Sequence, residues 1–528
     1  MSDAGVSDER GSAGHVFVYR GDIRTLACDA WYFPMDTDLA FSPAWLQGDE
    51  QLADAVSAVR REDLPADWGG DGRRVHPLTL TDARRATPVL AAINVRGTND
   101  PSYHRETLRQ FVEATAALPR PKGMERAKRL LAVPLIGTGD SGGMWHRGKH
   151  LQSVLKGLAE EAERVSIDIA LVTRDGPSTA AAHAVRRTMT YRALSWDELS
   201  GDLHDHARRL AELARRGQLV IFSGAGLGRS AGLPDWKQLL IELATKSGFD
   251  EPVKTRLAQL DVLDQAALLS GRLGASEMTD YIAELLNVPH HGLSHGLIAN
   301  MPVHEIATLN YDQLHELAAK GAGFELSVLP YEPVSDRWLL KMHGCIAPGR
   351  RQDIVLTRSQ YLGFSQHRAS LTGLVQALLV TRHMLFVGFA LRDDHFHSVV
   401  HDVRRALGDN ARTGKLGTAL LLEPDELQQE LWEKDLSYVA TGHGGLESAR
   451  RLEIFLDLVL SLASGSDVYL FDATFEEVLT KDERALRDEL KVLASRVSAF
   501  ADAPAWQRVR QLLDDLGAPP AKSDRRVR

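Results

Sequence analysis

Cysteine is almost missing from this chain, whose 528 residues include only Cys28 and Cys345. These two residues lie far apart in the sequence, so they do not supply the disulfide framework that holds small exported domains together. Free thiols persist in reducing compartments, and we therefore expect the protein to be cytoplasmic.

Long apolar segments are missing as well. No uninterrupted apolar run approaches the roughly 20 residues that a membrane-spanning helix needs. The first residues, MSDAGVSDERGSAG, are polar and acidic and lack the apolar core of a signal peptide. We therefore expect no membrane association, and we expect residues 1–14 to form a disordered leader.

A surplus of positive charge is also lacking. The net charge of −9 and the isoelectric point near 6.1 argue against a protein whose main surface wraps nucleic acid. What is present is an ordinary globular composition, with 44% hydrophobic residues. The length is too great for one core and predicts about three domains of ~100–200 residues each.

The most informative segment is 219–237, LVIFSGAGLGRSAGLPDWK. The apolar run at 219–222 predicts a buried strand, glycines follow at 224 and 226, and a helical pattern begins at Trp236. A strand that runs into glycines and then a helix presents backbone N–H groups to a dinucleotide pyrophosphate. Because the spacing differs from G-x-G-x-x-G, this pattern alone is weak evidence.

The whole segment resembles the nucleotide loop of the sirtuins, GAG-I-S-x-x-(S/A)-G-I-P-D-F-R. It departs from that pattern at Gly228, Trp236 and Lys237. Residues 306–316, IATLNYDQLHE, are similar to the family's T-Q-N-I-D-x-L-H segment, and residues 340–344, LKMHG, to its catalytic His-Gly. Residues 384–396, MLFVGFALRDDHF, resemble the later strand and loop around the adenosine.

The resemblance implies a Rossmann-like domain that takes NAD as its substrate, and it implies roles for matching residues. The resemblance implies two catalytic residues. His343 would act as a general base on a ribose hydroxyl or water, and Asn310 would hold the nicotinamide ribose or the attacking water. The residues expected to bind NAD are Gly224, Ala225, Gly226, Pro234, Asp235, Trp236, Asp312 and Gly388. Asp312 either contacts nicotinamide or caps the helix that starts near Gln313, and both roles are compatible.

Protein-deacylating sirtuins carry a zinc module held by four cysteines between the His-Gly and the later glycine loop. The interval 344–388 of this chain contains only Cys345, whereas a structural zinc site needs about four N/S ligands. We therefore expect no zinc. The cluster Asp393–His397 invites a metal interpretation, which we reject because an Asp after a strand more often caps the next helix.

Zinc-free sirtuin-like domains with Trp at position 236 resemble the NAD-hydrolysing effectors of bacterial antiphage systems. The expected function is an NAD glycohydrolase that releases nicotinamide and ADP-ribose and depletes NAD when triggered. Two alternatives remain. One is an NAD-dependent protein deacylase or ADP-ribosyltransferase, and the other is a catalytically silent nucleotide sensor.

The N-terminal region has a second resemblance. Residues 21–31, GDIRTLACDAW, resemble the opening of a macrodomain, and 133–143, VPLIGTGDSGG, resemble its phosphate loop. The resemblance implies a site for a nucleotide or ADP-ribose-like activator, built from Asp22, Gly137, Thr138, Gly139 and Gly142. Residues 32–36 replace the family's Asn-rich stretch, so we do not expect ADP-ribose hydrolysis. A scaffold without a ligand is an equal alternative.

These patterns predict a multidomain α/β chain. We expect a macrodomain-like α/β domain at 15–192, a sirtuin-like NAD-binding domain at 193–464, and a mainly helical segment at 465–528. The helical patterns at 195–216 and 481–500 are candidate contacts in a homo-oligomer. A companion defence protein is a further candidate partner.

Overall fold

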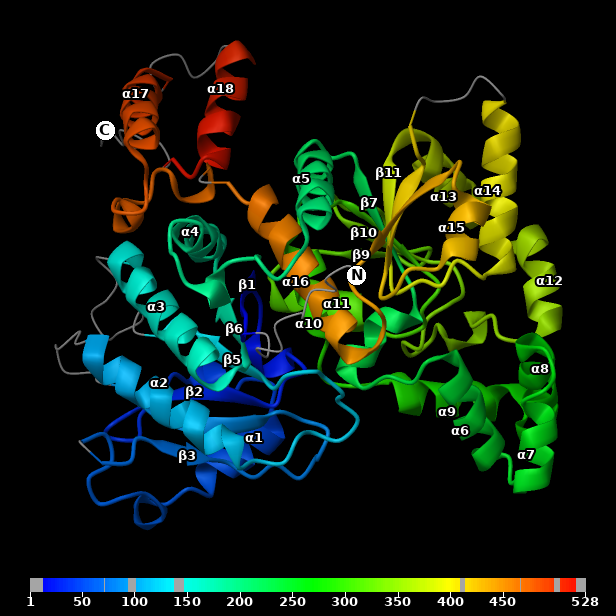
Figure 1. Cartoon of the computed structure of the whole chain (residues 1–528), viewed down its shortest axis with the longest axis horizontal. Helices are drawn as coiled ribbons and strands as arrows, with labels where there is room; N and C mark the ends of the chain where they lie inside the picture. The colour runs from blue at the N-terminus through cyan, green and yellow to red at the C-terminus, as the bar shows by residue number, and fades with distance from the viewer. Residues whose placement is uncertain are drawn as a thin grey trace, which may run out of the picture.

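The computed structural model describes residues 13–70, 72–93, 101–136, 147–408, 414–465, 467–497 and 504–518. Within them the chain forms two α/β units, each built on its own sheet (Figure 1). The phosphate-loop residues Gly137, Thr138, Gly139 and Gly142 and most of the expected leader lie outside the described residues. None of the described helices combines the length and apolar character needed to cross a membrane.

The first unit contains a six-stranded sheet of order β1-β6-β5-β2-β4-β3, in which only β3 runs antiparallel to its neighbour. Its strands are β1 (Val16–Arg20), β2 (Ala30–Asp36), β3 (Val75–Pro77), β4 (Thr87–Ile93), β5 (Leu130–Pro134) and β6 (Asp168–Thr173). The strands predicted near residues 15, 89, 131 and 167 are therefore confirmed. β5 and β6 are buried along their whole length, as expected for parallel strands covered on both faces.

The helices of the first unit are α1 (Glu50–Ser57), α2 (Pro101–Ala116), α3 (Arg147–Val165) and α4 (Gly176–Arg186). α2, α3 and α4 cover one face of the sheet (Figure 1), where Val16 and Val18 of β1 point into their core. Phe17 and Tyr19 alternate with these residues and so point to the opposite face. That face is covered by helices of the second unit.

The second unit contains a seven-stranded, wholly parallel sheet of order β13-β12-β11-β7-β8-β10-β9. Its strands are β7 (Leu219–Ser223), β8 (Glu305–Thr308), β9 (Ser327–Leu329), β10 (Trp338–Lys341), β11 (His383–Val387), β12 (Gly417–Leu421) and β13 (Leu436–Ala440). Its helices are α5 (Gly201–Arg215), α6 (Trp236–Lys246), α7 (Glu251–Leu257), α8 (Val262–Leu273), α9 (Ala275–Leu286), α10 (Leu293–Asn300), α11 (Leu314–Gly321), α12 (Arg358–His367), α13 (Ala369–Thr381), α14 (Asp394–Leu407), α15 (Glu426–Trp432) and α16 (Gly445–Ala463). The predicted α/β architecture with a parallel sheet is confirmed.

The two units share one hydrophobic core. Phe17 and Tyr19 of β1 belong to the same buried cluster as Leu210 of α5, Leu297 of α10 and Leu458 of α16. Figure 1 shows α16 lying between the two sheets. Because the apolar faces of both sheets meet across these helices, the two units form a continuous packed body.

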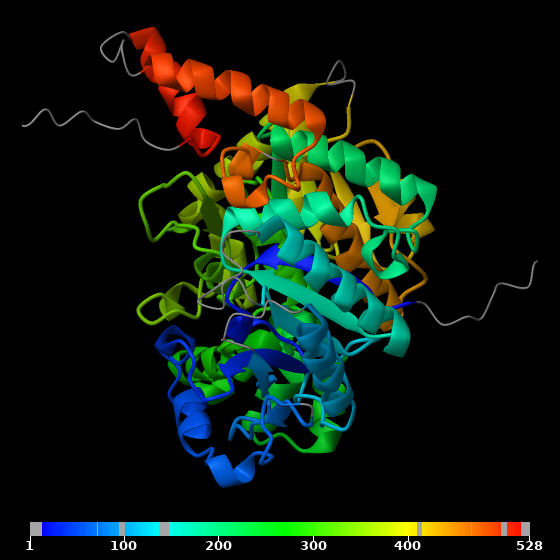
Figure 2. The same cartoon turned by 90° about the vertical axis from the view of Figure 1, so that its left-hand side faces the viewer.

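The C-terminal segment returns to the first unit. Tyr469, Leu470, Phe475 and Leu479 are buried in the core that α3 and α4 cover. The helices α17 (Lys481–Val497) and α18 (Pro504–Asp515) follow and lie at the end of the molecule opposite β3 (Figures 1 and 2).

Candidate active site

The carboxyl ends of four neighbouring strands meet at one level of the second sheet. Val387 of β11 pairs with Ser223 of β7, Ser223 pairs with Thr308 of β8, and Thr308 pairs with Lys341 of β10. The residues that follow these four by one or two positions are the predicted site residues Gly388, Gly224, Asn310 and His343. Motifs far apart in the sequence therefore come together at one edge.

This edge lies at the point where the order of the strands reverses. From β7 the chain forms β8 next to it, then β9 at the edge and β10 between β8 and β9, and it then crosses to the other side of β7 as β11. In open parallel sheets, dinucleotides bind in the crevice outside the carboxyl ends of the strands at such a switch point.

The glycine loop after β7 packs directly on the end of β11. The Gly224 N–H donates to the Val387 carbonyl and the Gly226 N–H to the Gly388 carbonyl, each at 3.0 Å. Gly388 has φ of +63°, and a Cβ atom there would lie 2.4 Å from the Leu227 nitrogen. Two of the amides expected to anchor a pyrophosphate are thus already bonded to the last residue of β11 and the residue after it, while Ala225 and Gly226 remain exposed.

Asp235 and Trp236 begin α6 directly after this loop. Asp235 accepts a hydrogen bond from the Gln238 N–H at 2.9 Å and pairs with Arg229 at 2.9 Å, so its carboxylate caps the helix. The ring of Trp236 lies 6.4 Å from that of Tyr311, the neighbour of Asn310. The structure thus brings the ring of Trp236 near the predicted catalytic segment and gives Asp235 a structural task.

Asn310 and Asp312 both hold the backbone of the site. The Asn310 side-chain amide donates to the Gly224 carbonyl at 3.1 Å, which links the second motif to the glycine loop. Asp312 is buried and accepts from the Leu314 N–H, the first amide of α11, at 3.0 Å, while Gln313 occupies the N-cap position itself.

Lys341 is a member of the site that the sequence analysis missed. Its ammonium group is buried, pairs with Glu316 at 2.9 Å and bonds the Asp312 carbonyl. Burial lowers the pKa of Lys341, but Glu316 and nearby negative groups outweigh that effect and hold the pKa above its ordinary value. A lysine inside an otherwise apolar strand is a signal for such a buried pair.

His343 follows β10 and is almost completely buried. Burial is the main cause that lowers its pKa from 6.5 to about 4, opposed by the negative charge of Asp393. The imidazole is therefore neutral at pH 7 and able to accept a proton, although it is a weaker base than the ordinary value of 6.5 suggests.

His343 also meets the cluster that follows β11. Ligand atoms of His343, Asp393 and His395 all lie within 4.8 Å of one another, a grouping that could hold a metal ion. Asp393 nevertheless acts as the expected cap of α14, accepting from the Phe396 N–H at 3.0 Å. It also accepts a hydrogen bond from the Tyr361 hydroxyl.

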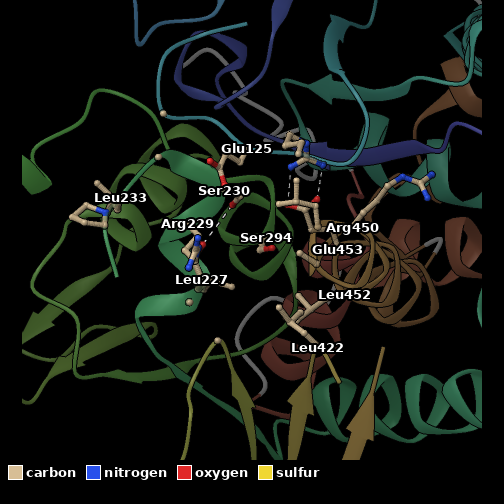
Figure 3. A pocket seen from close by; sticks show the side chains of 18 of the residues that line it. Glu125, Leu227, Arg229, Ser230, Leu233, Ser294, Leu422, Arg450, Leu452 and Glu453 are labelled. Carbon is tan, nitrogen blue, oxygen red and sulfur yellow. Dashed lines mark hydrogen bonds and ion pairs between the residues drawn. The ribbon is translucent and has the colours of Figure 1, made fainter. Parts of the chain in front are cut away.

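A cavity of about 800 Å³ opens on the other side of the glycine loop, over β11 and β12 (Figure 3). Leu227, Leu420 and Leu452 supply apolar walls, while Arg229 and Glu125 supply charges. Glu125 belongs to the first unit, so both units line this cavity. Its size suits a nucleotide-sized ligand.

The loop that carries Glu125 also touches the nucleotide loop. Gly123 and Gly232 both have positive φ, and a Cβ atom on Gly232 would lie 3.2 Å from the Gly123 carbonyl oxygen. Next to Gly123, Met124 packs in the buried cluster of Leu233 and α6. The first unit is therefore in direct contact with the segment predicted to bind NAD.

Asp22 is the one predicted regulatory residue within the described structure. Asp22 follows the carboxyl end of β1, and Pro134 is the last residue of β5. Because β1 and β5 both pair with β6 in parallel, Asp22 and the end of β5 lie at the same edge of the first sheet. Its carboxylate pairs with Arg24 at 2.6 Å. Burial raises the pKa of Asp22, but the hydrogen bonds and charge of Arg24 outweigh that effect and keep it below its ordinary value.

A comparison with known protein families matches the part of the chain that forms much of this edge of the second sheet. Residues 304–439 match the SIR2-like domain family. The matched SIR2-like segment includes Asn310, His343 and Gly388 and begins after the glycine loop.

Several curated relatives are similar to part of the chain. The NAD(+) hydrolase ThsA of Enterococcus faecium is 28% identical over 39% of this chain and 44% of its own length. The NAD(+) hydrolase ThsA of Bacillus cereus is 27% identical over 41% of this chain and 48% of its own. Defense-associated sirtuin 2 of Bacillus subtilis is 25% identical over 40% and 22%. The chain thus spans less than half the length of each of these relatives.

Proposed function

We propose that this protein hydrolyses NAD to nicotinamide and ADP-ribose. The observation that carries the proposal is the meeting of Gly224, Gly388, Asn310 and His343 at the switch point of a parallel sheet. Partial relatives whose names are NAD(+) hydrolase support the same chemistry. The adenosine half of NAD would occupy the cavity over β11 and β12, and the nicotinamide half would lie toward β8 and β10.

The reaction breaks the bond between ribose C1′ and the nicotinamide nitrogen, and nicotinamide leaves with the bonding electron pair. Positive charge develops at C1′ as in other glycosyl transfers. Water then adds to C1′ and loses a proton, for which neutral His343 is the nearby base. Asn310 holds the glycine loop in place, and Trp236 limits the space on the nicotinamide side.

Turnover of NAD by the purified protein tests this proposal. His343→Ala and Asn310→Ala should each lower the rate of nicotinamide release at least ~10²-fold, because the first removes the base beside the reacting ribose and the second removes the side chain that holds the glycine loop in place. His401→Ala, an exposed histidine on α14, should retain the wild-type rate. An unchanged rate in His343→Ala would show that the site lies elsewhere.

The cysteine content of the second unit disfavours protein deacylation as the activity. Between Gly344 and Gly388 the only thiol is Cys345, which is buried and free, so the chain has no cysteine set for a structural zinc ion there. We expect nicotinamide release to be independent of acyl-lysine peptides and to persist after dialysis against EDTA. Peptide-dependent release, or one tightly bound zinc per chain by mass spectrometry, would contradict this.

We further propose that the protein is a gated effector of antiphage defence, because unregulated NAD hydrolysis would drain its own cell. The macrodomain-like region at 15–192 would bind a nucleotide or ADP-ribose-like activator beside Asp22. One route for its effect is α11, which begins beside the buried Asp312 and ends at Gly321, where an added Cβ atom would lie 3.1 Å from the Asp22 nitrogen. An activator must bind the two states of the enzyme unequally to shift it.

Addition of ADP-ribose itself tests the gate. It should change the rate of NAD hydrolysis by the wild type, and Asp22→Asn and Gly139→Trp should remove that response while the basal rate stays the same. Equal rates with and without ADP-ribose across all three proteins would leave the first unit with a scaffold role only.

A homo-oligomer and a companion defence protein are proposed as partners. α5 uses its apolar face against α16, so it offers a charged outer face, whereas α17 leaves Leu486 54% exposed. We therefore assign the self-contact to α17. Light scattering should give a multiple of the 58.1 kDa chain mass and a smaller mass for Leu486→Glu.

A further inference from the structure

The hydrogen-bond partners of two histidines determine where their protons lie. His395 Nε2 is 2.9 Å from the Tyr361 carbonyl oxygen, and a carbonyl can only accept. Nε2 of His395 therefore carries the proton, and in the neutral ring Nδ1 keeps its lone pair. His343 Nε2 lies 3.3 Å from that Nδ1.

The second bond follows from the first. Because His395 Nδ1 accepts, His343 must donate from Nε2, which leaves the lone pair of His343 on Nδ1. In the part of the chain that the structure describes, Nδ1 of His343 has no hydrogen-bond partner. Nδ1 is thus the atom free to take a proton from water or from a ribose hydroxyl.

His395 is itself held rigidly. Its ring stacks on that of Tyr361 at a centroid distance of 3.6 Å and an angle of 6°, and on Phe364 at 4.3 Å. The Tyr361 hydroxyl donates to Asp393, which caps the helix that carries His395. The stack and the cap together fix the position of Nδ1 relative to His343.

We propose that His395 is a positioning residue that holds His343 in the Nε2–H tautomer and so makes Nδ1 the base for NAD hydrolysis. This inference rests on the proposed function. When His343 takes up a proton at Nδ1, its Nε2–H keeps the bond to His395, and the Asp393 carboxylate lies within the same cluster. His395 touches neither substrate nor water in this scheme and acts only through His343.

The two amide side chains provide a matched pair of variants. His395→Asn places an amide oxygen close to the position of Nδ1 and preserves an acceptor for His343. His395→Gln extends to the position of Nε2, so it preserves the bond to Tyr361 but loses that acceptor. His397→Asn is the control, because His397 bonds the Leu391 carbonyl at 2.8 Å and packs on Trp432.

Steady-state nicotinamide release by the full chain gives the readout. We expect His395→Gln and His395→Leu to lower kcat about 10- to 100-fold with KM changed by less than about threefold. His395→Asn should keep kcat within about fivefold of the wild type, and His397→Asn should match it. Circular dichroism confirms that each variant is folded.

Three results would overturn the inference. Equal losses in the Asn and Gln variants would show a packing role, and wild-type kcat in the Gln and Leu variants would show no role. A divalent metal at one per chain, lost from the Leu variant together with activity, would assign His343, Asp393 and His395 to a metal site instead. If the variants match the wild type while the wild type hydrolyses NAD, only the positioning role fails, whereas a wild type without turnover overturns the proposed function as well.

Discussion

At the scale of single residues, Gly388 shows how backbone geometry shapes the site. Its φ is +63°, and a Cβ atom there would lie only 2.4 Å from the Leu227 nitrogen, so the residue tolerates no side chain. Gly408 has a similar φ of +66° but open space around it. The pair therefore separates the cost of backbone conformation from the cost of a clash.

Gly408→Ala should destabilise the protein by about 1–3 kcal/mol, because its φ of +66° and ψ of −178° define a backbone conformation that residues with a Cβ atom rarely adopt. Gly388→Ala should cost more and should also raise KM for NAD, because the glycine loop must move away from β11. Thermal unfolding and steady-state kinetics measure both effects. Equal KM values in the two variants would contradict the assignment of Gly388 to the NAD site.

The pKa of His343 predicts the pH dependence of the proposed reaction. A base must be neutral to act, and its pKa of about 4 keeps His343 neutral throughout the physiological range. We expect kcat/KM to stay flat between about pH 8 and pH 5.5, where an ordinary histidine would already be protonated. A fall centred near pH 6.5 would show that the base titrates as an ordinary histidine and would contradict the lowered pKa of His343.

At the scale of elements, α16 carries an unusual set of buried charges. Arg450, Glu453 and Asp457 are spaced by three and four residues and so occupy one face of the helix. Arg450 pairs with Asp168 at 2.9 Å, Glu453 pairs with Arg126, and Asp457 pairs with Arg186 at 2.8 Å. This face joins α16 to the first unit through ion pairs that water does not reach.

Asp457→Ala should lower the free energy of unfolding by about 3–5 kcal/mol, because it leaves the guanidinium of Arg186 buried without its partner. Asp205→Ala on α5 removes an equal charge from a side chain that is 77% exposed and should change stability by less than about 1 kcal/mol. Urea unfolding of both variants tests the difference. Similar values would mean that the α16 contacts contribute little.

The sequence predicted the elements whose periodicity is strong. β7 and α6 around the glycine loop, and β5, β6, α3 and α17, lie where their patterns indicated. The sequence analysis named no strand at β2, which contains Pro34, a residue uncommon in central strands. In the structure β2 pairs with β5 only at Ala30 and Trp31, so Pro34 interrupts no hydrogen bond on that side.

The candidate site was predictable in part, for a physical reason. Asn310, His343 and Gly388 sit at strand ends in motifs of fixed spacing, and parallel pairing aligns them. His395 and Lys341 matter through side-chain contacts with residues far along the chain, and although local patterns mark both residues as unusual, they do not identify those partners. The charges of α16 would be assigned to a solvent face by sequence rules, since their partners lie in a separate unit.

At the scale of the whole molecule, buried neutral histidines govern acid stability. Burial lowers the pKa of His291 to about 4, and of His183 and His295 to about 3. Between these values and 6.5 the unfolded chain binds more protons than the folded one, so stability falls as pH falls. Each group contributes up to about 1.4 kcal/mol per pH unit in that window.

We therefore expect the unfolding midpoint in urea to drop steadily from pH 7 to pH 5. His295→Leu should flatten this dependence, whereas His401→Leu, at an exposed position, should leave it unchanged. A midpoint that is constant over this range in the wild type would show that these histidines titrate normally in the folded protein.

The ion pairs of α16 also have a consequence for how the protein is made. The ion pair between Arg186 and Asp457 forms only after Asp457 has been synthesised, and Asp457 lies 271 residues further along the chain. At about 5–20 residues per second, a ribosome takes roughly 15 to 50 s to synthesise that interval. Throughout this time Arg186 lacks its buried partner and the apolar face of the first sheet lacks the cover of α16, so we expect the N-terminal unit alone to be less stable than the same unit in the full chain.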